Sequence, residues 1–235
     1  MNTQAVHKNF NPKIYNTVYL TRKKLLEGIQ KHAPLLKGKM LDFGCGSKPY
    51  RSLFTVDEYI GLDFEGQGHS HANEQIDFFY DGKTFPFADN SFDCALSSEV
   101  FEHVFNLEEI VPEIHRVLKK GGIILITCPF AISEHEQPND YARYTSFAIK
   151  HLMEKNGFEI VAYEKLGNSI DTITQLRLGY YAINFYPKLK KVPLLYEATS
   201  FVLNVWGNCK AILLSKIFPA GNELYLNNLL VCKKK

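Results

Sequence analysis

The decapeptide LDFGCGSKPY, residues 41–50, has the residue types of a nucleotide-binding turn. Gly44 and Gly46 flank one residue, and an apolar run precedes them. Without a Cβ, each glycine lets the backbone approach a ligand closely. A dinucleotide fingerprint would need a third glycine and would bring a pyrophosphate to a helix N-terminus. Here Pro49 stands in place of that glycine, and Asp42 would repel phosphate. The turn therefore favours a ligand with an adenosine-like body and a cationic end.

Two further acids support this interpretation. Asp63 comes 17 residues after Gly46, at the end of an apolar stretch. A carboxylate there can accept hydrogen bonds from both ribose hydroxyls. Asp81 follows the next apolar stretch, where its oxygen could accept a hydrogen bond from an adenine amine. Each acid could instead only satisfy loop amides, so it is their agreement with the glycine turn that indicates a nucleoside site.

A second group of chemically useful residues follows Ser98. Glu99, Glu102 and His103 have the i, i+3, i+4 spacing that shares a helix face. One interpretation makes His103 a general base, or makes the trio a metal site that polarises an acceptor hydroxyl. The other makes Glu102 and His103 supporting or helix-capping groups. We predict Glu99 and His103 as catalytic residues, and we predict no metal ligands.

The stretch SEHEQPNDYARYT, residues 133–145, is rich in directional polar groups. Loops at this place in a sheet commonly carry recognition residues. We predict that His135 and Arg143 contact an acceptor with hydroxyl or acidic groups. The alternative is that Arg143 pairs with Asp140 or Glu136 and only makes the loop rigid.

The elements that must position these residues alternate between strands and helices. Strands are expected at residues 40–43, 58–64, 75–80, 92–98, 123–128, 158–166 and 223–232. Helices are expected at residues 11–36, 106–118 and 146–155, the last closed by Asn156 and Gly157. This alternation predicts an α/β fold with a mostly parallel, doubly wound sheet.

The start of the helix at 106–118 is ambiguous. Asn106 and Glu109 resemble a capping box. An interior Pro112, however, removes one hydrogen bond and clashes with the preceding turn. The sequence therefore also allows a start near Val111.

The ends of the chain add helical segments to one predicted domain spanning residues 1–235. Residues 1–37 form an N-terminal helical segment, and residues 168–222 are too long for a bare loop. We expect a helical insertion there, which is either a cap on the sheet, a homodimer surface or a lid over the acceptor. In the lid version, Lys188, Lys190 and Lys191 contact an anionic membrane surface peripherally.

Composition excludes several classes of function. The 235 residues carry a net charge of +2, which does not favour nucleic acid as a partner. The five cysteines are scattered, without the paired spacing of disulfides or zinc sites. Together with an N-terminus that lacks an apolar signal segment, this predicts a cytoplasmic protein.

The ordered motifs resemble a known family. LDFGCGSKPY, YIGLDF, DGKTFPFADNSFDCALSSEVFEHV and EIHRVLKKGGIILITCPF are similar to the class I S-adenosylmethionine-dependent methyltransferases, most closely to their type 11 group. That group includes ubiquinone- and menaquinone-biosynthesis enzymes. The resemblance covers about residues 38–166 and implies a seven-stranded Rossmann-like sheet with order 3-2-1-4-5-7-6.

The resemblance also implies a cofactor and its contacts. S-adenosyl-L-methionine would occupy the turn, with Asp42, Gly44 and Gly46 at its methionine part, Asp63 at the ribose and Asp81 at the adenine. The complete predicted set of cofactor contacts is Asp42, Phe43, Gly44, Cys45, Gly46, Asp63, Phe64, Asp81, Gly82 and Ser98.

These features predict a methyltransferase that acts on oxygen in a small-molecule or glycan-type acceptor. One alternative is a quinone-precursor methyltransferase that acts on oxygen or carbon. Another is a catalytically silent partner subunit that binds S-adenosylmethionine. A dehydrogenase is disfavoured by the missing glycine and by Asp42.

Overall fold

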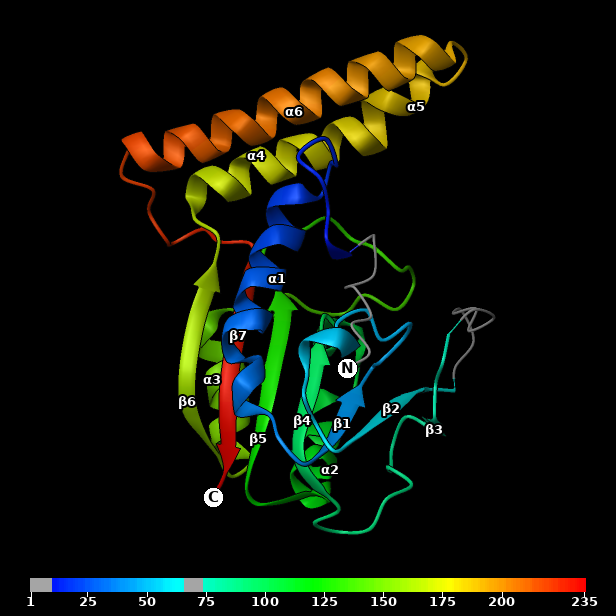
Figure 1. Cartoon of the computed structure of the whole chain (residues 1–235), viewed down its shortest axis with the longest axis vertical. Coiled ribbons are helices and arrows are strands. Elements are labelled where there is room, and N and C mark those ends of the chain that lie inside the picture. The colour runs from blue at the N-terminus through cyan, green and yellow to red at the C-terminus, as the bar shows by residue number, and fades with distance from the viewer. Residues whose placement is uncertain (1–9, 66–73) are drawn as a thin grey trace.

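One seven-stranded sheet runs through the molecule, with strand order β3-β2-β1-β4-β5-β7-β6 (Figure 1). The structure, a computed structural model, describes residues 10–65 and 74–235. The strands are β1 (Lys39–Phe43), β2 (Glu58–Phe64), β3 (Phe78–Tyr80), β4 (Phe92–Ser98), β5 (Leu118–Pro129), β6 (Phe158–Leu166) and β7 (Asn227–Lys234). The predicted fold class and strand order are confirmed.

The strand directions gather the carboxyl ends that matter for a site. β1 pairs in parallel with β2 and with β4, and β4 pairs in parallel with β5. β7 is antiparallel to both β5 and β6. The residues that follow β1, β2, β4 and β5 therefore meet at one edge of the sheet, where doubly wound folds bind ligands.

Helices cover both faces of the sheet. They are α1 (Tyr19–His32), α2 (Leu107–Val117), α3 (Ser146–Lys155), α4 (Ser169–Tyr180), α5 (Tyr186–Leu189) and α6 (Pro193–Ile217), with single turns η2 (Ala33–Leu35), η3 (Arg51–Leu53), η4 (Phe101–His103) and η5 (Tyr181–Phe185). In β5, Leu125 packs in the cluster that includes α1, whereas Ile124 and Ile126 pack in the cluster that includes α2 and α3. This period of two buries both faces of β5, as its uniformly apolar sequence predicts.

The N-terminal helix is shorter than predicted. It begins at Tyr19 rather than at residue 11, and residues 1–9 of the predicted N-terminal segment lie outside the described residues. The side chain of Asn208 donates hydrogen bonds to the carbonyls of Ile14 (2.7 Å) and Asn16 (3.1 Å), and Asn204 donates one to Tyr15 (3.0 Å). Because α6 takes up these carbonyls, the preceding residues form turns instead of helix.

The alternative prediction that α2 starts near Val111 is also wrong, since α2 begins at Leu107 and contains Pro112. The proline removes one backbone hydrogen bond, while the helix buries Ile110, Val111 and Ile114 against the sheet. The predicted capping box does not form. Asn106 instead donates hydrogen bonds to the Gly82 carbonyl (3.0 Å) and to the Glu109 carboxylate (2.9 Å).

Several strand ends differ from the prediction, whereas α3 occupies 146–155 as expected. β3 starts at Phe78, and just before it the Asp77 side chain accepts the Gly61 amide (2.6 Å). β5 is longer than 123–128, and β7 begins at Asn227 instead of residue 223. Among the described helices, none has the length and apolar character needed to cross a bilayer.

Candidate functional site

The turn after β1 adopts a backbone that favours glycine. Gly44 and Gly46 have φ angles of 71° and 43°, in the left-handed region. A Cβ on Gly44 would overlap the side chain of Val100. The amides of Gly44 and Cys45 donate to the Leu62 carbonyl at 2.8 and 3.2 Å, which fastens the turn to β2. Gly44 and Gly46 are partly exposed at the carboxyl end of β1, and their contact with a ligand stays a prediction.

Asp63 holds the same turn from the next strand. Its carboxylate accepts the Gly46 amide at 2.8 Å and the Phe64 amide at 2.8 Å. The acid predicted to bind ribose therefore also shapes the turn. Its role toward a ligand stays a prediction.

Asp42 is a buried acid beside the turn. Burial raises its pKa to about 7, while a 2.5 Å hydrogen bond from the Tyr59 hydroxyl opposes that rise and the charge of Asp63 adds to it. A carboxyl group in this condition shares its proton near neutral pH, and a cation placed beside it would favour the ionised form.

Two of the predicted cofactor contacts have buried side chains. Phe43 packs in the core with its ring centroid 5.2 Å from that of Phe85. Cys45 is buried against Gly61. Only the backbone of Phe43 and Cys45 is therefore left to contact a ligand.

Phe64, Asp81 and Gly82 lie together beyond β2 and β3. The half-exposed Phe64 ring lies 5.7 Å from that of Tyr80, and a Cβ on Gly82 would come within 2.9 Å of it. Asp81 accepts the amides of Lys83 (2.9 Å) and Thr84 (3.0 Å), which lower its pKa. An exposed aromatic ring beside an ionised acid fits a purine with an exocyclic amine.

Ser98 ends β4 and Glu99 follows it, at the carboxyl end of the strand as predicted. The Ser98 hydroxyl is 3.0 Å from the hydroxyl of Thr127, and Glu99 takes a left-handed φ of 59°. Burial raises the pKa of Glu99 to about 7, and hydrogen bonds from Thr127 and Asn227 and the charge of Arg22 counteract it. The Asn227 amide donates to Glu99 at 2.6 Å. A second buried carboxyl thus stands at the strand next to Asp42.

The predicted helix face shared by Glu99, Glu102 and His103 is wrong. Glu99 lies outside any helix in its left-handed conformation, and the other two belong to the single turn η4. Glu102 is fully buried, and neither of its carboxyl oxygens has a hydrogen-bond partner among the described residues. Burial and the nearby Glu99 raise the pKa of Glu102 well above its usual range. Burial thus favours the neutral form of Glu102.

His103 and His135 meet although 32 residues separate them. Their ring centroids are 4.8 Å apart with nearly perpendicular planes. His103 Nδ1 is 2.6 Å from the Asn139 carbonyl, so Nδ1 carries the proton and donates it. In the neutral ring Nε2 would then hold the lone pair, and it lies 3.6 Å from carboxyl oxygens of Glu102 and Glu136. The neutral tautomer suits a proton acceptor.

Arg143 pairs with Asp140, which was one of the two alternatives. Two of its guanidinium nitrogens lie 2.5 and 2.6 Å from the two carboxylate oxygens. Asp140 also accepts the backbone amide of His135 at 2.9 Å. The Arg143 hydrogen bonds lower the pKa of Asp140 to about 2. The positive charge of Arg143 also acts on Glu99 and Glu102, so the braced loop borders the buried acids.

Three side chains at this place could hold a metal ion. Glu102, His103 and His135 each offer one ligand atom, and these atoms lie within 4.8 Å of one another. One carboxylate and two imidazoles form a donor set used by several divalent transition metals. Our expectation of no metal ligands here stays a prediction.

Sequence reasoning missed the groups around Glu99. Asn227 reaches Glu99 from β7, and Arg22 on α1 acts on both Glu99 and Tyr50. Tyr50 closes the decapeptide that holds the glycine turn, so its position was a usable signal. Nothing local marks Arg22 or Asn227, because the fold alone brings them near Glu99.

Comparison with known proteins agrees with this arrangement. Residues 41–126 match a family model described as "Methyltransferase domain". A sterol 24-C-methyltransferase of Yarrowia lipolytica is 30% identical over 152 residues, which are 57% of this chain and 40% of that protein. A protein of Mycolicibacterium smegmatis described as "Probable S-adenosylmethionine-dependent methyltransferase" is 26% identical over 134 residues, which are 52% of each protein. The chain thus spans about half the length of these relatives, or less.

A solved structure shows the same fold. Phosphoethanolamine N-methyltransferase 2 of Haemonchus contortus, in complex with S-adenosyl-L-methionine, superposes with a TM-score of 0.54 at 17% identity, covering 99% of this chain and 60% of that one. The match over residues 41–126, together with the strand order, supports a resemblance to the class I S-adenosylmethionine-dependent methyltransferases of the type 11 group.

Proposed function

We propose that the protein transfers the methyl group of S-adenosylmethionine to an oxygen of a small-molecule or glycan-type acceptor. One observation carries the proposal. Asp42, Asp63 and Glu99 stand at the ends of three neighbouring strands, around a turn whose glycines expose backbone. Such a ring of carboxylates favours a cationic sulfonium nucleoside and disfavours a phosphate carrier.

The residues fit this cofactor in separate parts. Asp42 and the Gly44–Gly46 backbone would hold the methionine portion, Asp63 the ribose hydroxyls, and Phe64 with Asp81 the adenine. The cofactor supplies an activated methyl group on a positively charged sulfur. The chain's own task is to position that group and the acceptor, and such alignment can contribute roughly 7–11 kcal/mol at its best.

His103 is our candidate for the general base. As the acceptor oxygen forms its bond to the methyl carbon and the methyl–sulfur bond breaks to leave S-adenosylhomocysteine, the hydroxyl proton would move to His103 Nε2. The Nδ1–H bond to the Asn139 carbonyl fixes the tautomer that leaves Nε2 able to accept it. Glu102 and Glu136 each place a carboxyl oxygen 3.6 Å from Nε2, where a carboxylate would stabilise the imidazolium that this transfer forms.

The loop with His135 and Arg143 is our candidate for acceptor recognition. It is tied to η4 by a 2.8 Å bond from the Tyr141 amide to the Glu102 carbonyl. The Asp140 pair holds Arg143 in one orientation, which leaves the guanidinium edge near Glu99 fixed before an acceptor arrives. Recognition by a braced arginine costs less side-chain entropy than recognition by a mobile one.

A carbon acceptor is the second candidate, because a sterol 24-C-methyltransferase is among the relatives. It includes the quinone-precursor alternative. The two differ in where the methyl group arrives, and a carbon nucleophile that loses its proton needs a base for a C–H group. If the acceptor atom is carbon, the ¹³C-labelled product should show a methyl resonance near those of other alkyl carbons. If the acceptor atom is oxygen, the product should show a methoxy resonance.

The experiment pairs binding with turnover. Calorimetry should show that the purified protein binds S-adenosylmethionine and S-adenosylhomocysteine, and a labelled-methyl assay over hydroxylated, glycan and quinone-type acceptors should show transfer. His103→Gln should lower kcat about 10²–10⁴-fold with cofactor affinity unchanged. His151→Gln, an exposed histidine on α3, is the matched control. Cofactor binding without turnover of any acceptor would instead favour the silent partner subunit.

A further inference from the structure

Helices α4 and α6 turn polar side chains toward the rest of the protein. The buried residues of α6 are Asn204, Gly207, Asn208 and Ala211, and those of α4 are Asp171, Thr172, Thr174, Gln175 and Leu178. Asn204 and Asn208 hold the backbone of residues 14–17, and Gln175 donates to the Thr17 carbonyl at 2.8 Å. The inner face of this hairpin is therefore joined to the N-terminal segment mainly through hydrogen bonds.

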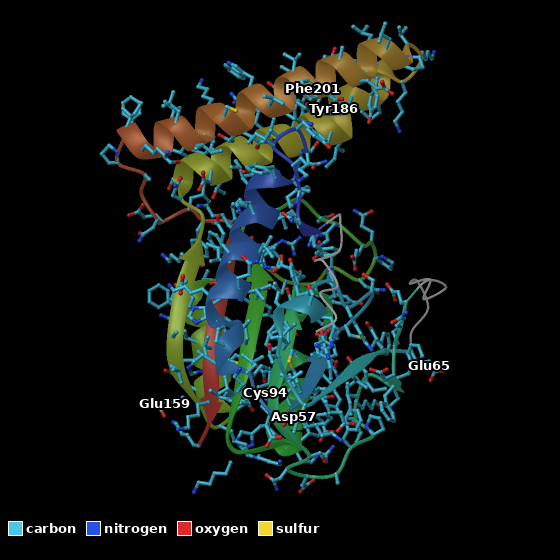
Figure 2. All side chains as sticks on the ribbon, in the orientation of Figure 1. Asp57, Glu65, Cys94, Glu159, Tyr186 and Phe201 are labelled. Carbon is cyan, nitrogen blue, oxygen red and sulfur yellow. The ribbon has the colours of Figure 1, made fainter. Side chains whose placement is uncertain are left out.

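The opposite face of α6 is apolar and exposed. Leu195, Val202, Trp206, Leu213 and Ile217 are each between 49% and 62% exposed. Their spacing of seven, four, seven and four residues places them in one stripe along the helix. In Figure 2, side chains project from the side of α6 that faces away from the sheet. This is the reverse of an ordinary surface helix, whose apolar stripe faces the core.

The neighbouring helix continues this surface. Ile173, Leu176, Tyr180 and Ile183, on α4 and η5, are exposed as well. We call the exposed apolar residues of α4, η5 and α6 the outer face. A continuous group of exposed apolar residues on a protein surface normally marks an interaction site.

Charge on the hairpin is mostly positive. Residues 169–217 contain six lysines or arginines against two acids, whereas the whole chain has 27 against 25. One of the two acids, Asp171, is buried in the inner face. Lys188, Lys190 and Lys191 cluster at the turn between α5 and α6, and Lys210 and Lys216 flank the apolar stripe. The outer face is thus apolar with a cationic border.

The hairpin lies at the functional end of the molecule. Figure 1 shows α4 and α6 across the end toward which the arrows of β4, β5 and β6 point. The carboxyl ends of β1, β2 and β4, where the candidate site is built, lie toward that same end. A surface that contacts the outer face would therefore be near the site.

We propose that the outer face docks on an anionic lipid bilayer, with α6 lying in the plane of the interface. An apolar stripe with lysines along its border matches an interfacial helix, whose apolar side chains enter the boundary between headgroups and acyl chains. Glu197, Lys210 and Lys216 interrupt α6, which suits a helix on a membrane rather than through it. A second copy of the chain is less well matched, because two outer faces would bring like charges together. Docking does not depend on whether the protein transfers a methyl group.

Vesicle co-sedimentation tests this directly. Wild-type protein should bind vesicles of phosphatidylcholine with 30% phosphatidylglycerol and bind pure phosphatidylcholine vesicles at least tenfold more weakly. Added salt should weaken binding, since screening shortens the reach of the lysines. The outer-face variant Val202→Gln/Trp206→Gln/Leu213→Gln should lose at least tenfold in vesicle affinity. A variant with Phe147→Gln and Val161→Thr, which removes exposed apolar groups elsewhere, should bind as wild type does.

The lysines have their own matched pair. Lys188→Gln/Lys190→Gln/Lys191→Gln should reduce affinity for anionic vesicles on the order of 100-fold, since each lysine near such a surface contributes about fivefold. Lys120→Gln/Lys155→Gln/Lys235→Gln removes exposed lysines near the amino-terminal ends of β5 and β6 and near the C-terminus, and should have little effect. Circular dichroism and thermal melts verify that each variant is folded.

Two outcomes would overturn the proposal. One is wild-type protein that stays in the supernatant with anionic vesicles at low salt. The other is sedimentation-velocity data showing a wild-type dimer that the outer-face variant converts to a monomer, which would make the outer face a contact between two copies. Cofactor calorimetry on the outer-face variant should give wild-type affinity, so a failure here leaves the methyl-transfer proposal standing.

Discussion

The sheet edge and the hairpin both depart from the usual distribution of polar and apolar groups in a folded protein. The sheet edge buries polar groups, and the hairpin exposes apolar groups. At the sheet edge, Asp42, Glu99 and Glu102 are carboxyl groups removed from water. On the hairpin, Trp206 and Leu213 are apolar groups left in water. Both arrangements cost free energy in the isolated protein. The comparison suggests that each region is shaped for something outside the chain, a cation at the edge and an apolar surface at the hairpin.

The largest effect is expected where the backbone has no room. Gly44→Val should weaken S-adenosylmethionine binding on the order of 100-fold, because the left-handed φ and the overlap with Val100 both strain the turn. Gly179→Ala is the control on the hairpin, where a Cβ meets open space. That change should leave binding unaltered and stabilise α4 by about 0.5–1 kcal/mol. Equal losses of cofactor affinity in both variants would show that binding does not depend on glycine at position 44.

The second largest effect on cofactor affinity is expected from the negative charge of Asp42 at the sheet edge. Asp42→Asn keeps the shape of the side chain and removes its negative charge, so affinity for the cationic cofactor should fall about 30-fold or more. Asp57→Asn, an exposed acid, should change nothing measurable. Calorimetry gives both constants. An Asp42→Asn protein with wild-type affinity would remove the charge argument.

On the hairpin, we expect that replacing a buried polar residue by an apolar one lowers the free energy of unfolding more than replacing an exposed apolar residue by a polar one. Asn208→Leu, on the inner face, should cost about 1–3 kcal/mol because it removes the side-chain donor to the Ile14 carbonyl and one of the two donors to the Asn16 carbonyl. Val202→Gln, on the outer face, should change stability by less than about 0.5 kcal/mol in water. Urea unfolding measures both. If the apolar-to-polar change were the more damaging, the outer face would be packed against something within the chain.

The loop pair gives the smallest expected effect. The pKa of Asp140 is lowered to about 2 in the folded protein, so its pairing adds stability above about pH 4 that is lost as the pH falls toward 2. We expect about 1 kcal/mol, because the pair borders solvent and is screened. The stability difference between wild type and Asp140→Asn should therefore shrink across that range. A difference that grows on acidification would mean that Asp140 is protonated when folded.

The fold was largely predictable because its signals are local. The glycine turn, the alternation of strands with helices, and α3 with its Gly157 terminus are all written in short stretches. The start of α1 was not, since side chains on α6, 189 and 194 residues away, take up the carbonyls before it. Periodicity also assigns an apolar stripe to a core, and α6 carries its stripe on the other side.

The site divides in the same way. Asp42, Gly44 and Asp63 could be found from spacing, because they follow strands that the pattern reveals. The conformation of Glu99 could not, since a left-handed glutamate has no sequence signature. Asn227 is 128 residues from Glu99 and reaches it only because β7 inserts between β5 and β6.

The pH dependence of cofactor affinity tests the central claim most directly. Asp42 holds a proton below about pH 7, and a cationic ligand binds better to its ionised form, so affinity should rise with pH and level off above about 7. Well below pH 7 this single group contributes about tenfold per pH unit. Calorimetry from pH 5.5 to 7.5 should show this rise in the wild-type protein. In Asp42→Asn, the slope of the logarithm of affinity against pH should be smaller by about one unit. Affinity that does not change with pH, or tight binding of NAD with none of S-adenosylmethionine, would contradict a carboxylate ring built for a cation.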